Sequence, residues 1–160
     1  MSQSSDNSSN TPVIKCESVY KIFGNNALKL LQNSNGQVDA KTFQKAGCIV
    51  GVNNASFGVK KGEMMVVMGL SGSGKSTLLR CISRLTDATA GKIFIDGEDL
   101  LSMNSKQLIE LRRNKMGMVF QSFALLPHKT VIENIAFPLQ VKGTNTRESM
   151  AKALEMVELV

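Results

Sequence analysis

The chain has 160 residues, of which 42% are apolar, 20% charged and 5% aromatic. This length corresponds to one domain with a hydrophobic core of its own, and no apolar run approaches the ~18 residues that a membrane-spanning helix needs. The formal net charge of +6 comes from basic residues scattered along the chain, which argues against a dedicated nucleic-acid surface and predicts no nucleic-acid partner.

The first twelve residues (1–12) form a polar tail rich in Ser and Asn, a composition typical of disordered segments. The tail has neither the basic start nor the apolar stretch of a secretory signal. The three cysteines, Cys16, Cys48 and Cys81, are widely spaced and follow no metal-ligand pattern. We therefore expect free thiols in a reducing compartment.

The next part of the chain predicts two strands with helices between them. Residues 13–23 are rich in β-branched and aromatic residues, which favours a strand. On composition alone, its aromatic residues Tyr20 and Phe23 are expected to pack in the core or at a sheet edge. Residues 25–51 contain two short helical patterns, and residues 49–59 return to strand character.

Residues 64–85 combine a short apolar run, a glycine-rich loop and a helical pattern, in that order. The apolar run 64–68 predicts a strand buried on both faces, as in a parallel sheet. The loop that follows, GLSGSGKS at 69–76, fits the pattern G-x-x-x-x-G-K-[ST]. A strand before this loop and a helix after it are the context that the pattern requires.

The residue types of this loop suit a polyphosphate. Its glycines let backbone N–H groups converge on a phosphate at a helix N-terminus. Lys75 would place its charge on the β- and γ-phosphates, Ser76 would offer a hydroxyl to Mg²⁺, and Thr77 adds a second hydroxyl. A chance glycine-rich turn is the alternative, but so specific a match is rare. The predicted nucleoside-triphosphate site comprises Gly69, Leu70, Ser71, Gly72, Ser73, Gly74, Lys75, Ser76 and Thr77.

Residues 92–96 predict a short strand that closes on the turn Asp96-Gly97. An apolar run followed by acidic residues resembles the strand that holds Mg²⁺ in many P-loop enzymes. However, this run is short and Asp-Gly is the signal of a tight hairpin. We therefore interpret Asp96 and Glu98 as hairpin residues rather than catalytic acids.

A helix is expected from Asn104 or Ser105 to Arg113, followed by an apolar strand at 116–120 that leads into Gln121. Open α/β sheets bind their ligands at the carboxyl ends of their strands. Gln121 is therefore a candidate ligand of Mg²⁺ or of a water molecule, with an ordinary surface amide as the alternative.

The last part of the chain predicts two helices. The sequence TVIE at 130–133 indicates a capping box, and residues 145–148 resemble a second one. His128 is the only histidine and has no evident acidic or serine partner, so a structural or surface role is favoured over catalysis. The apolar face expected on the last helix comprises Met150, Ala153, Leu154 and Val157.

Taken together, these motifs resemble the ATP-binding subunits of ABC transporters. The resemblance lies in the phosphate loop, in MVFQSFALLPH at 118–128 and in TVIEN at 130–134. The sequences GLSGSGKSTLLR and KMGMVFQSFALLPH and the insertion at 25–51 resemble, more narrowly, the glycine betaine/proline importers. The resemblance covers residues 13–160, and the phosphate loop is its least specific part because many NTPases share it.

The resemblance implies an α/β fold: a P-loop NTPase core with an antiparallel β-subdomain and, over residues 122–160, the start of a helical subdomain. It implies that Phe23 stacks on adenine, in place of the packing role. It also implies catalytic roles for Lys75 and Gln121, with Ser76 and Gln121 as ligands of Mg²⁺. ATP and Mg²⁺ would then be the cofactors.

The partners implied by the resemblance are a second copy of the subunit, with ATP between the two, and a membrane permease contacted by the region after Gln121. A solute-binding protein would be an indirect partner. The implied location is the cytoplasmic face of the inner membrane, as a peripheral subunit. The implied function is ATP hydrolysis that drives import of a compatible solute such as glycine betaine.

Several motifs of the same family are absent from the 160 residues: the L-S-G-G signature, the apolar strand ending in Asp-Glu, and the switch histidine. We interpret the chain as truncated at its C-terminus and expect it to bind MgATP without turning it over. Two alternatives remain, a non-catalytic nucleotide-binding remnant and a soluble P-loop NTPase that acts on nucleic acid. A GTPase is disfavoured, because residues 114–117 lack the Asp of N-K-x-D.

Overall fold

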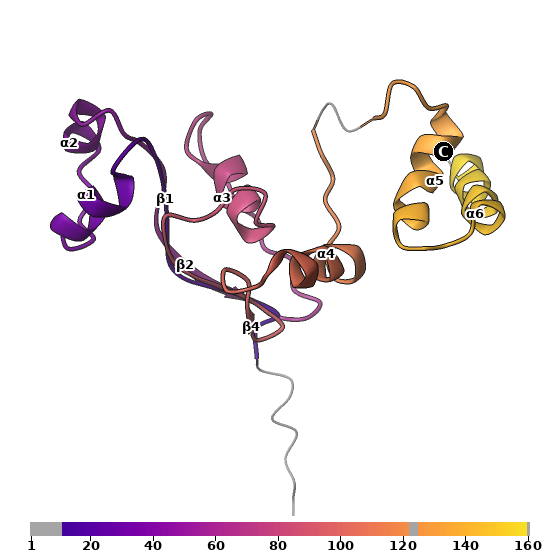
Figure 1. Cartoon of the computed structure of the whole chain (residues 1–160), viewed down its shortest axis with the longest axis horizontal. Coiled ribbons are helices and arrows are strands. Elements are labelled where there is room, and N and C mark those ends of the chain that lie inside the picture. Colours follow the sequence, from indigo (N-terminus) through magenta and orange to yellow (C-terminus); the bar gives the residue numbers. More distant parts are fainter. Residues whose placement is uncertain (1–10, 122–124, 160) are drawn as a thin grey trace, which may run out of the picture. The chain divides into compact units, whose positions relative to one another are not determined.

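The computed structural model describes residues 11–121 and 125–159 (Figure 1). The tail expected over residues 1–12 therefore lies outside the described residues except for its last two. The chain divides into two compact units, one that ends at Asn104 and one that begins at Ser105. Within the described ranges, no helix is long and apolar enough to cross a membrane.

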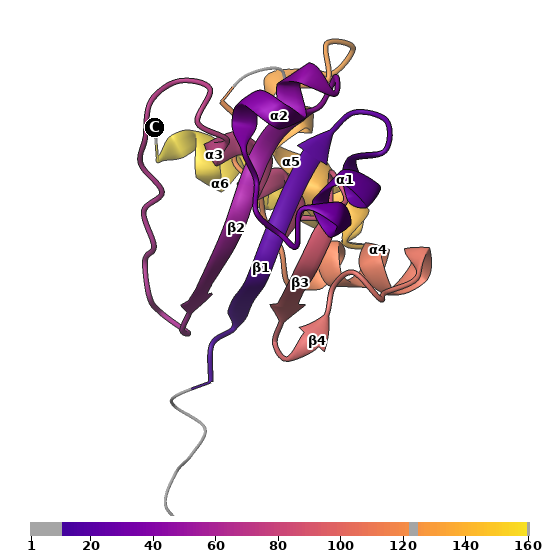
Figure 2. The same ribbon diagram turned by 90° about the vertical axis from the view of Figure 1, so that its left-hand side faces the viewer.

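The first unit is built on a four-stranded antiparallel sheet with the order β2-β1-β3-β4 (Figure 2). Its strands are β1 (Ile14–Phe23), β2 (Ile49–Val59), β3 (Ala90–Ile95) and β4 (Glu98–Asp99). The strands predicted at 13–23, 49–59 and 92–96 are thus confirmed. This sheet is the antiparallel β-subdomain that the family resemblance implies.

A two-residue turn joins β3 to β4. Asp96 and Gly97 have φ values of 49° and 81°, and Ile95 pairs directly with Glu98. Positive φ at both central residues is the mark of a type I′ turn, which matches the twist of the flanking strands. The interpretation of the acidic residues at this point as hairpin residues is confirmed.

Strand β1 contains a bulge at Ser18, which has a φ of 47°. The pairing register shifts there against both β2 and β3. Beyond the bulge, successive side chains alternate between the two faces of the sheet. Tyr20 and Ile22 therefore point to one face, and Lys21 and Phe23 point to the other.

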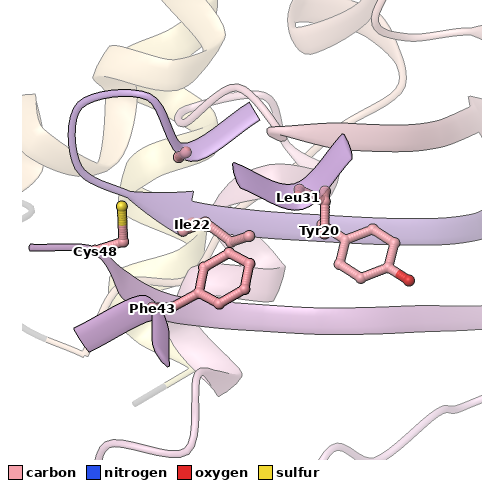
Figure 3. Packing of buried hydrophobic residues seen from close by; sticks show 6 residues of the cluster. Tyr20, Ile22, Leu31, Phe43 and Cys48 are labelled. Atoms are coloured by element: carbon pink, nitrogen blue, oxygen red, sulfur yellow. The ribbon is translucent and has the colours of Figure 1, made fainter. Parts of the chain in front are cut away.

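Two short helices, α1 (Ala27–Asn33) and α2 (Ala40–Lys45), fill the connection between β1 and β2, as predicted. They lie in front of the sheet in Figure 2. Their apolar side chains cover the face that carries Tyr20 and Ile22 (Figure 3). The buried cluster comprises Tyr20, Ile22, Ala27, Leu31, Phe43 and Cys48. The core role expected of Tyr20 is therefore confirmed, and its hydroxyl donates to the backbone oxygen of Gly36 at 3.2 Å.

The three cysteines are free and buried, which confirms the prediction of unpaired thiols. Burial raises the pKa of the Cys16 thiol to about 11, and the nearby Cys81 adds to this effect. Burial also raises the pKa of Cys81. Because the thiolate is the reactive form, both residues are inert packing groups at neutral pH.

Helix α3 (Lys75–Ile82) follows the glycine-rich loop and buries Leu78 and Cys81. Just after the helix, Arg84 anchors the segment that follows β4. Its guanidinium donates from Nη1 to the backbone oxygens of Leu100 at 2.9 Å and Met103 at 2.6 Å, and from Nε to Asp87 at 3.1 Å. These bonds tie the end of α3 to a distant part of the first unit.

The Arg84→Ala substitution is expected to lower the free energy of unfolding of the first unit by about 3 kcal/mol, because hydrogen bonds from a charged donor are worth about 1.5–3 kcal/mol each. Urea denaturation measures this loss. Arg80→Ala, which truncates an exposed side chain of α3, is the matched control and should change stability by less than about 0.5 kcal/mol. Equal losses in the two variants would contradict the anchoring role.

Two predicted strands are wrong. Residues 64–68 and 116–120 have no regular secondary structure, and Met64 and Val119 are 88% and 99% exposed. A strand that is buried on both faces needs a neighbour on each side for its backbone hydrogen bonds. Among the described residues, neither segment has a strand partner. Their apolar composition indicates a tendency to be buried, but it does not supply the partner.

The regular secondary structure of the second unit, over its described residues, is helical. The helices are α4 (Ser105–Asn114), α5 (Val131–Val141) and α6 (Thr146–Glu158). The capping box before α5 is confirmed, since Thr130 and Glu133 bond to each other's backbone N–H. The backbone and hydroxyl hydrogen bonds from Thr130 hold the pKa of the Glu133 carboxyl below its usual value. Asn145 caps α6 through the N–H of Glu148 at 2.9 Å.

Helices α5 and α6 pack against each other through small residues, with Ala136, Ser149 and Ala153 buried. The apolar face expected on α6 is only partly correct. Ala153 is buried, but Leu154 and Val157 are exposed. Small side chains allow the two helices to approach closely, which leaves the larger side chains outside their contact.

Candidate nucleotide-binding site

The glycine-rich loop 69–74 leads directly into the N-terminus of α3. Gly74 is the N-cap of the helix, with a φ of 90° and a ψ of 2°. The N–H groups of a helix's first turn have no partner within the helix and carry its positive dipole end. Lys75, Ser76 and Thr77 form this first turn. The structure therefore places all of the predicted phosphate-binding residues on one loop and one helix start.

The ammonium of Lys75 is folded into the loop. Nζ donates to the backbone oxygens of Gly69 at 2.8 Å and Leu70 at 2.7 Å, and it lies 3.5 Å from Oγ of Ser73. The loop thus curves around its own cation. A phosphate that enters the loop would exchange these neutral carbonyl partners for charged oxygens, which form stronger hydrogen bonds.

The loop rests on strand β2 at Gly51. A Cβ atom placed on Gly74 would overlap the backbone oxygen of Gly51, so the two backbones are in direct contact. A Cβ atom placed on Gly51 would lie 2.9 Å from Cε2 of Phe23 and 3.0 Å from Cγ2 of Thr77. Gly51 is therefore the point at which β1, the loop and α3 meet.

Phe23 ends β1 and is 43% exposed, so its ring is not part of the buried core. The Nζ of Lys21 lies 4.8 Å from the ring centroid, a cation–π distance. Lys21 also lies near α3, where its charge opposes the upward shift that burial causes in the pKa of Cys81. A partly exposed ring beside a phosphate loop can stack on a nucleobase.

A cavity of about 340 Å³ lies beneath the loop, and apolar side chains dominate its lining. The lining residues include Val50, Val52, Val67, Met68 and Leu78, together with Gly51 and Lys75. Phe23, Ser76 and Thr77 are not among them. The lining also includes Ser73 and Gly74, so the cavity shares these two loop residues and Lys75 with the predicted phosphate site.

Gln121 lies in the second unit, as an exposed residue at the end of the extended segment 116–120. The residues that follow it, 122–124, lie outside the described part of the chain. The phosphate loop belongs to the first unit, so the joint role of Gln121 and Ser76 as ligands of Mg²⁺ stays a prediction. His128 is exposed in the segment before α5, in keeping with a surface role.

The side chain of Asn134 anchors residues 125–129, which precede α5. The amide of Asn134 accepts from the N–H of Leu126 at 2.7 Å and donates to the backbone oxygens of Leu126 and Lys129, both at 3.1 Å. This segment and the start of α5 enclose a groove of about 270 Å³. The groove is lined by Leu125, Leu126, Pro127, Lys129, Val131, Asn134 and Ile135.

Reading the sequence alone did not identify Gly51 or Lys21 as parts of the site. A signal for Gly51 was present, since a glycine in a strand interior often marks a close approach of another backbone or a ligand. Gly51 stands between Val50 and Val52, two residues that favour strands. Lys21 had no comparable signal, because a lysine in a strand is ordinarily a solvated side chain.

Comparisons with known proteins match nearly the whole chain. A family model described as "ABC transporter" matches residues 52–160. The chain is 80% identical over 149 residues to the trimethylamine N-oxide transport system ATP-binding protein TmoW of Pelagibacter ubique, covering 93% of this chain and 44% of that protein. It is 49% identical to the glycine betaine transport ATP-binding protein OpuAA of Bacillus subtilis, covering 92% of this chain and 35% of that protein.

Among solved structures, a dimeric ATP-binding cassette, MJ0796, bound to ADP and Pi matches with a TM-score of 0.70 and 30% sequence identity. The match covers 91% of this chain and 56% of that one. The chain thus spans less than half the length of the two transport proteins and somewhat more than half of the solved cassette.

Proposed function

Because the chain belongs to the ATP-binding family of ABC transporters, we propose that its first unit binds ATP and Mg²⁺ as part of the energising subunit of a solute importer. The membership confirms the resemblance and the fold class that the sequence predicts. It also favours a transport role over the nucleic-acid alternative.

The observation that carries the proposal is the glycine-rich loop at the N-terminus of α3 with the Lys75 ammonium held inside it. Backbone donors, a helix dipole and a cation converge on one small volume, which is the combination that a polyphosphate requires. Phe23 would stack on the adenine, and the loop with Ser76 and Thr77 would hold the phosphates.

Magnesium fits the oxygen donors of the site. The Ser76 hydroxyl is exposed in the first turn of α3, and Gln121 carries an amide oxygen; both are hard oxygen ligands of the kind that Mg²⁺ prefers. The bound ion would neutralise charge on the β- and γ-phosphates. Lys75 would hold the transferred phosphate, and Gln121 would orient the attacking water.

The transported solute would carry a trimethylated nitrogen. The two relatives described above are named for trimethylamine N-oxide and for glycine betaine, and both molecules contain this group. The proposed class therefore adds trimethylamine N-oxide to the glycine betaine expected from the sequence, and it leaves out proline, whose nitrogen carries no methyl group. Solute choice would rest with the permease and a solute-binding protein, which this subunit energises.

The proposed assembly is a pair of these subunits on the cytoplasmic face of the membrane, with ATP bound between them. The pair would contact a permease that lies in the membrane. The groove beside Leu125 and Asn134 offers the permease an apolar surface of fixed shape, because the Asn134 amide anchors the segment that forms it. The 160 residues by themselves would bind MgATP without turnover. Phosphate release that disappears in the Lys75→Ala variant would contradict this last point.

Calorimetric titration of the chain with MgATP and with magnesium tripolyphosphate tests the nucleotide site. Phe23→Ala should raise the dissociation constant for MgATP about tenfold, because base–aromatic stacking is worth about 1–3 kcal/mol. The affinity for tripolyphosphate, which has no base, should stay the same. Phe94→Ala is a matched control, since Phe94 lies under Lys15 near the other end of β1. Failure of the unsubstituted chain to bind MgATP would overturn the proposal.

A further inference from the structure

Gly51 lies inside strand β2 at a position where its backbone does not require glycine. Its φ lies outside the positive range, unlike that of most glycines in the chain. Glycine in a strand interior costs conformational entropy and contributes no packing. The pairing register shifts here, since Lys21 pairs with Val52 and Ile22 with Val50, so Gly51 is the extra residue of a β-bulge. A bulge residue outside the positive φ range does not need glycine, and the space around position 51 supplies a separate reason for it.

That space is taken by the nucleotide site. A Cβ atom on Gly51 would meet the edge of the Phe23 ring at 2.9 Å, the methyl group of Thr77 at 3.0 Å and the backbone oxygen of Lys21 at 3.4 Å. The backbone oxygen of Gly51 itself supports Gly74 of the loop. One residue thus contacts the predicted base-stacking ring, the first turn of α3 and the phosphate loop.

We propose that Gly51 is a positioning residue that sets the separation between the Phe23 ring and the phosphate loop. This inference rests on the proposed function, in which one ATP molecule spans both. The base and the triphosphate of ATP are joined through one ribose. A ring that moves away from the loop therefore loses its stacking when the phosphates are in place.

A methyl group at position 51 would displace the ring rather than the loop. Ordinary carbon–carbon contacts lie at about 3.5–4.0 Å, so the ring edge would have to retreat by about 0.6–1 Å. Phe23 is at a strand end and partly exposed, and the flexible Lys21 side chain lies over its face. Thr77 is fixed in the first turn of α3, and its β-branched side chain is stiff at χ1, so the ring is the neighbour that yields.

The test compares four forms of the whole chain by calorimetric titration: unsubstituted, Gly51→Ala, Phe23→Ala and the double variant. Gly51→Ala should raise the dissociation constant for MgATP about fivefold, since part of the stacking is lost. The dissociation constant for magnesium tripolyphosphate should change less than about twofold. In the Phe23→Ala background, Gly51→Ala should add almost nothing, because the ring that it displaces is already gone.

Gly58→Ala is the matched control, because it adds the same methyl group to β2 beside Pro12, away from the loop. It should leave both affinities unchanged. Equal losses for ATP and tripolyphosphate, or full additivity in the double variant, would overturn the proposal. If Gly51→Ala prevents folding, recovery of folding in the double variant would support it, and failure of both variants to fold would overturn it. An unchanged ATP affinity in Phe23→Ala would instead disprove the proposed base site.

Discussion

The Lys75→Ala substitution is expected to raise the dissociation constant for MgATP by at least about a hundredfold. Hydrogen bonds between charged partners are worth about 1.5–3 kcal/mol each, and about 1.4 kcal/mol corresponds to a factor of ten. Lys75 is already positioned for this role, because its ammonium lies inside the loop against the oxygens of Gly69 and Leu70. Calorimetric titration measures the loss.

Lys92→Ala is the control for this substitution, since it removes the same charge from an exposed position on β3. It should alter the affinity less than twofold or so, as expected for a distant screened charge. If both variants lost affinity to the same extent, the effect would come from net charge, and a specific role for Lys75 would be excluded.

Gly91→Ala is expected to lower the free energy of unfolding of the first unit by about 2–5 kcal/mol. Gly91 has a φ of 96°, and a Cβ atom there would overlap the backbone oxygen of Ser18 and lie 2.7 Å from that of Glu17. Backbone atoms cannot rotate away as a side chain can. The cost of about 1–2 kcal/mol for a left-handed residue is therefore increased by overpacking of about 1–3 kcal/mol.

Gly97→Ala separates these two contributions. Gly97 has a φ of 81° but no atom within 4 Å of the added Cβ, so it should lose only the conformational part, about 1–2 kcal/mol. Urea denaturation of both variants gives the difference. Equal losses would show that the contact between Gly91 and the β1 bulge is not tightly packed.

Elements whose determinants are local could be predicted from the sequence. The Asp96-Gly97 turn, the capping box at Thr130 and the two short helices before β2 all depend on residues within a few positions of each other. The strands predicted at 64–68 and 116–120 are wrong, because a strand depends on a partner that can lie anywhere in the chain. Their apolar composition indicates burial, but it does not supply the neighbouring strand, and the described residues hold none beside them.

The candidate site also has a part that is determined by local sequence and a part that depends on contacts between distant segments. The phosphate loop is a contiguous motif, so its residues and their order at the start of α3 follow from the sequence. The role of Gly51 depends on two contacts, one with Phe23 and one with Thr77, that join segments far apart in the chain. Periodicity and motif patterns carry no information about such contacts, and a glycine between two valines was the sole trace of them.

The placement of α1 and α2 has a consequence for how the chain tolerates changes in length. Phe23 and Ile49 are paired across the sheet, so the intervening segment leaves and re-enters at one point beside the nucleotide site. Doubling the length of such a segment costs only about 0.6 kcal/mol in closure entropy. One residue added within β2, by contrast, would reverse the facing of every side chain beyond it. We therefore expect insertions to be tolerated in the connection beside Phe23 but not within β2. This connection is the natural position for a genetically inserted reporter of the proposed nucleotide binding.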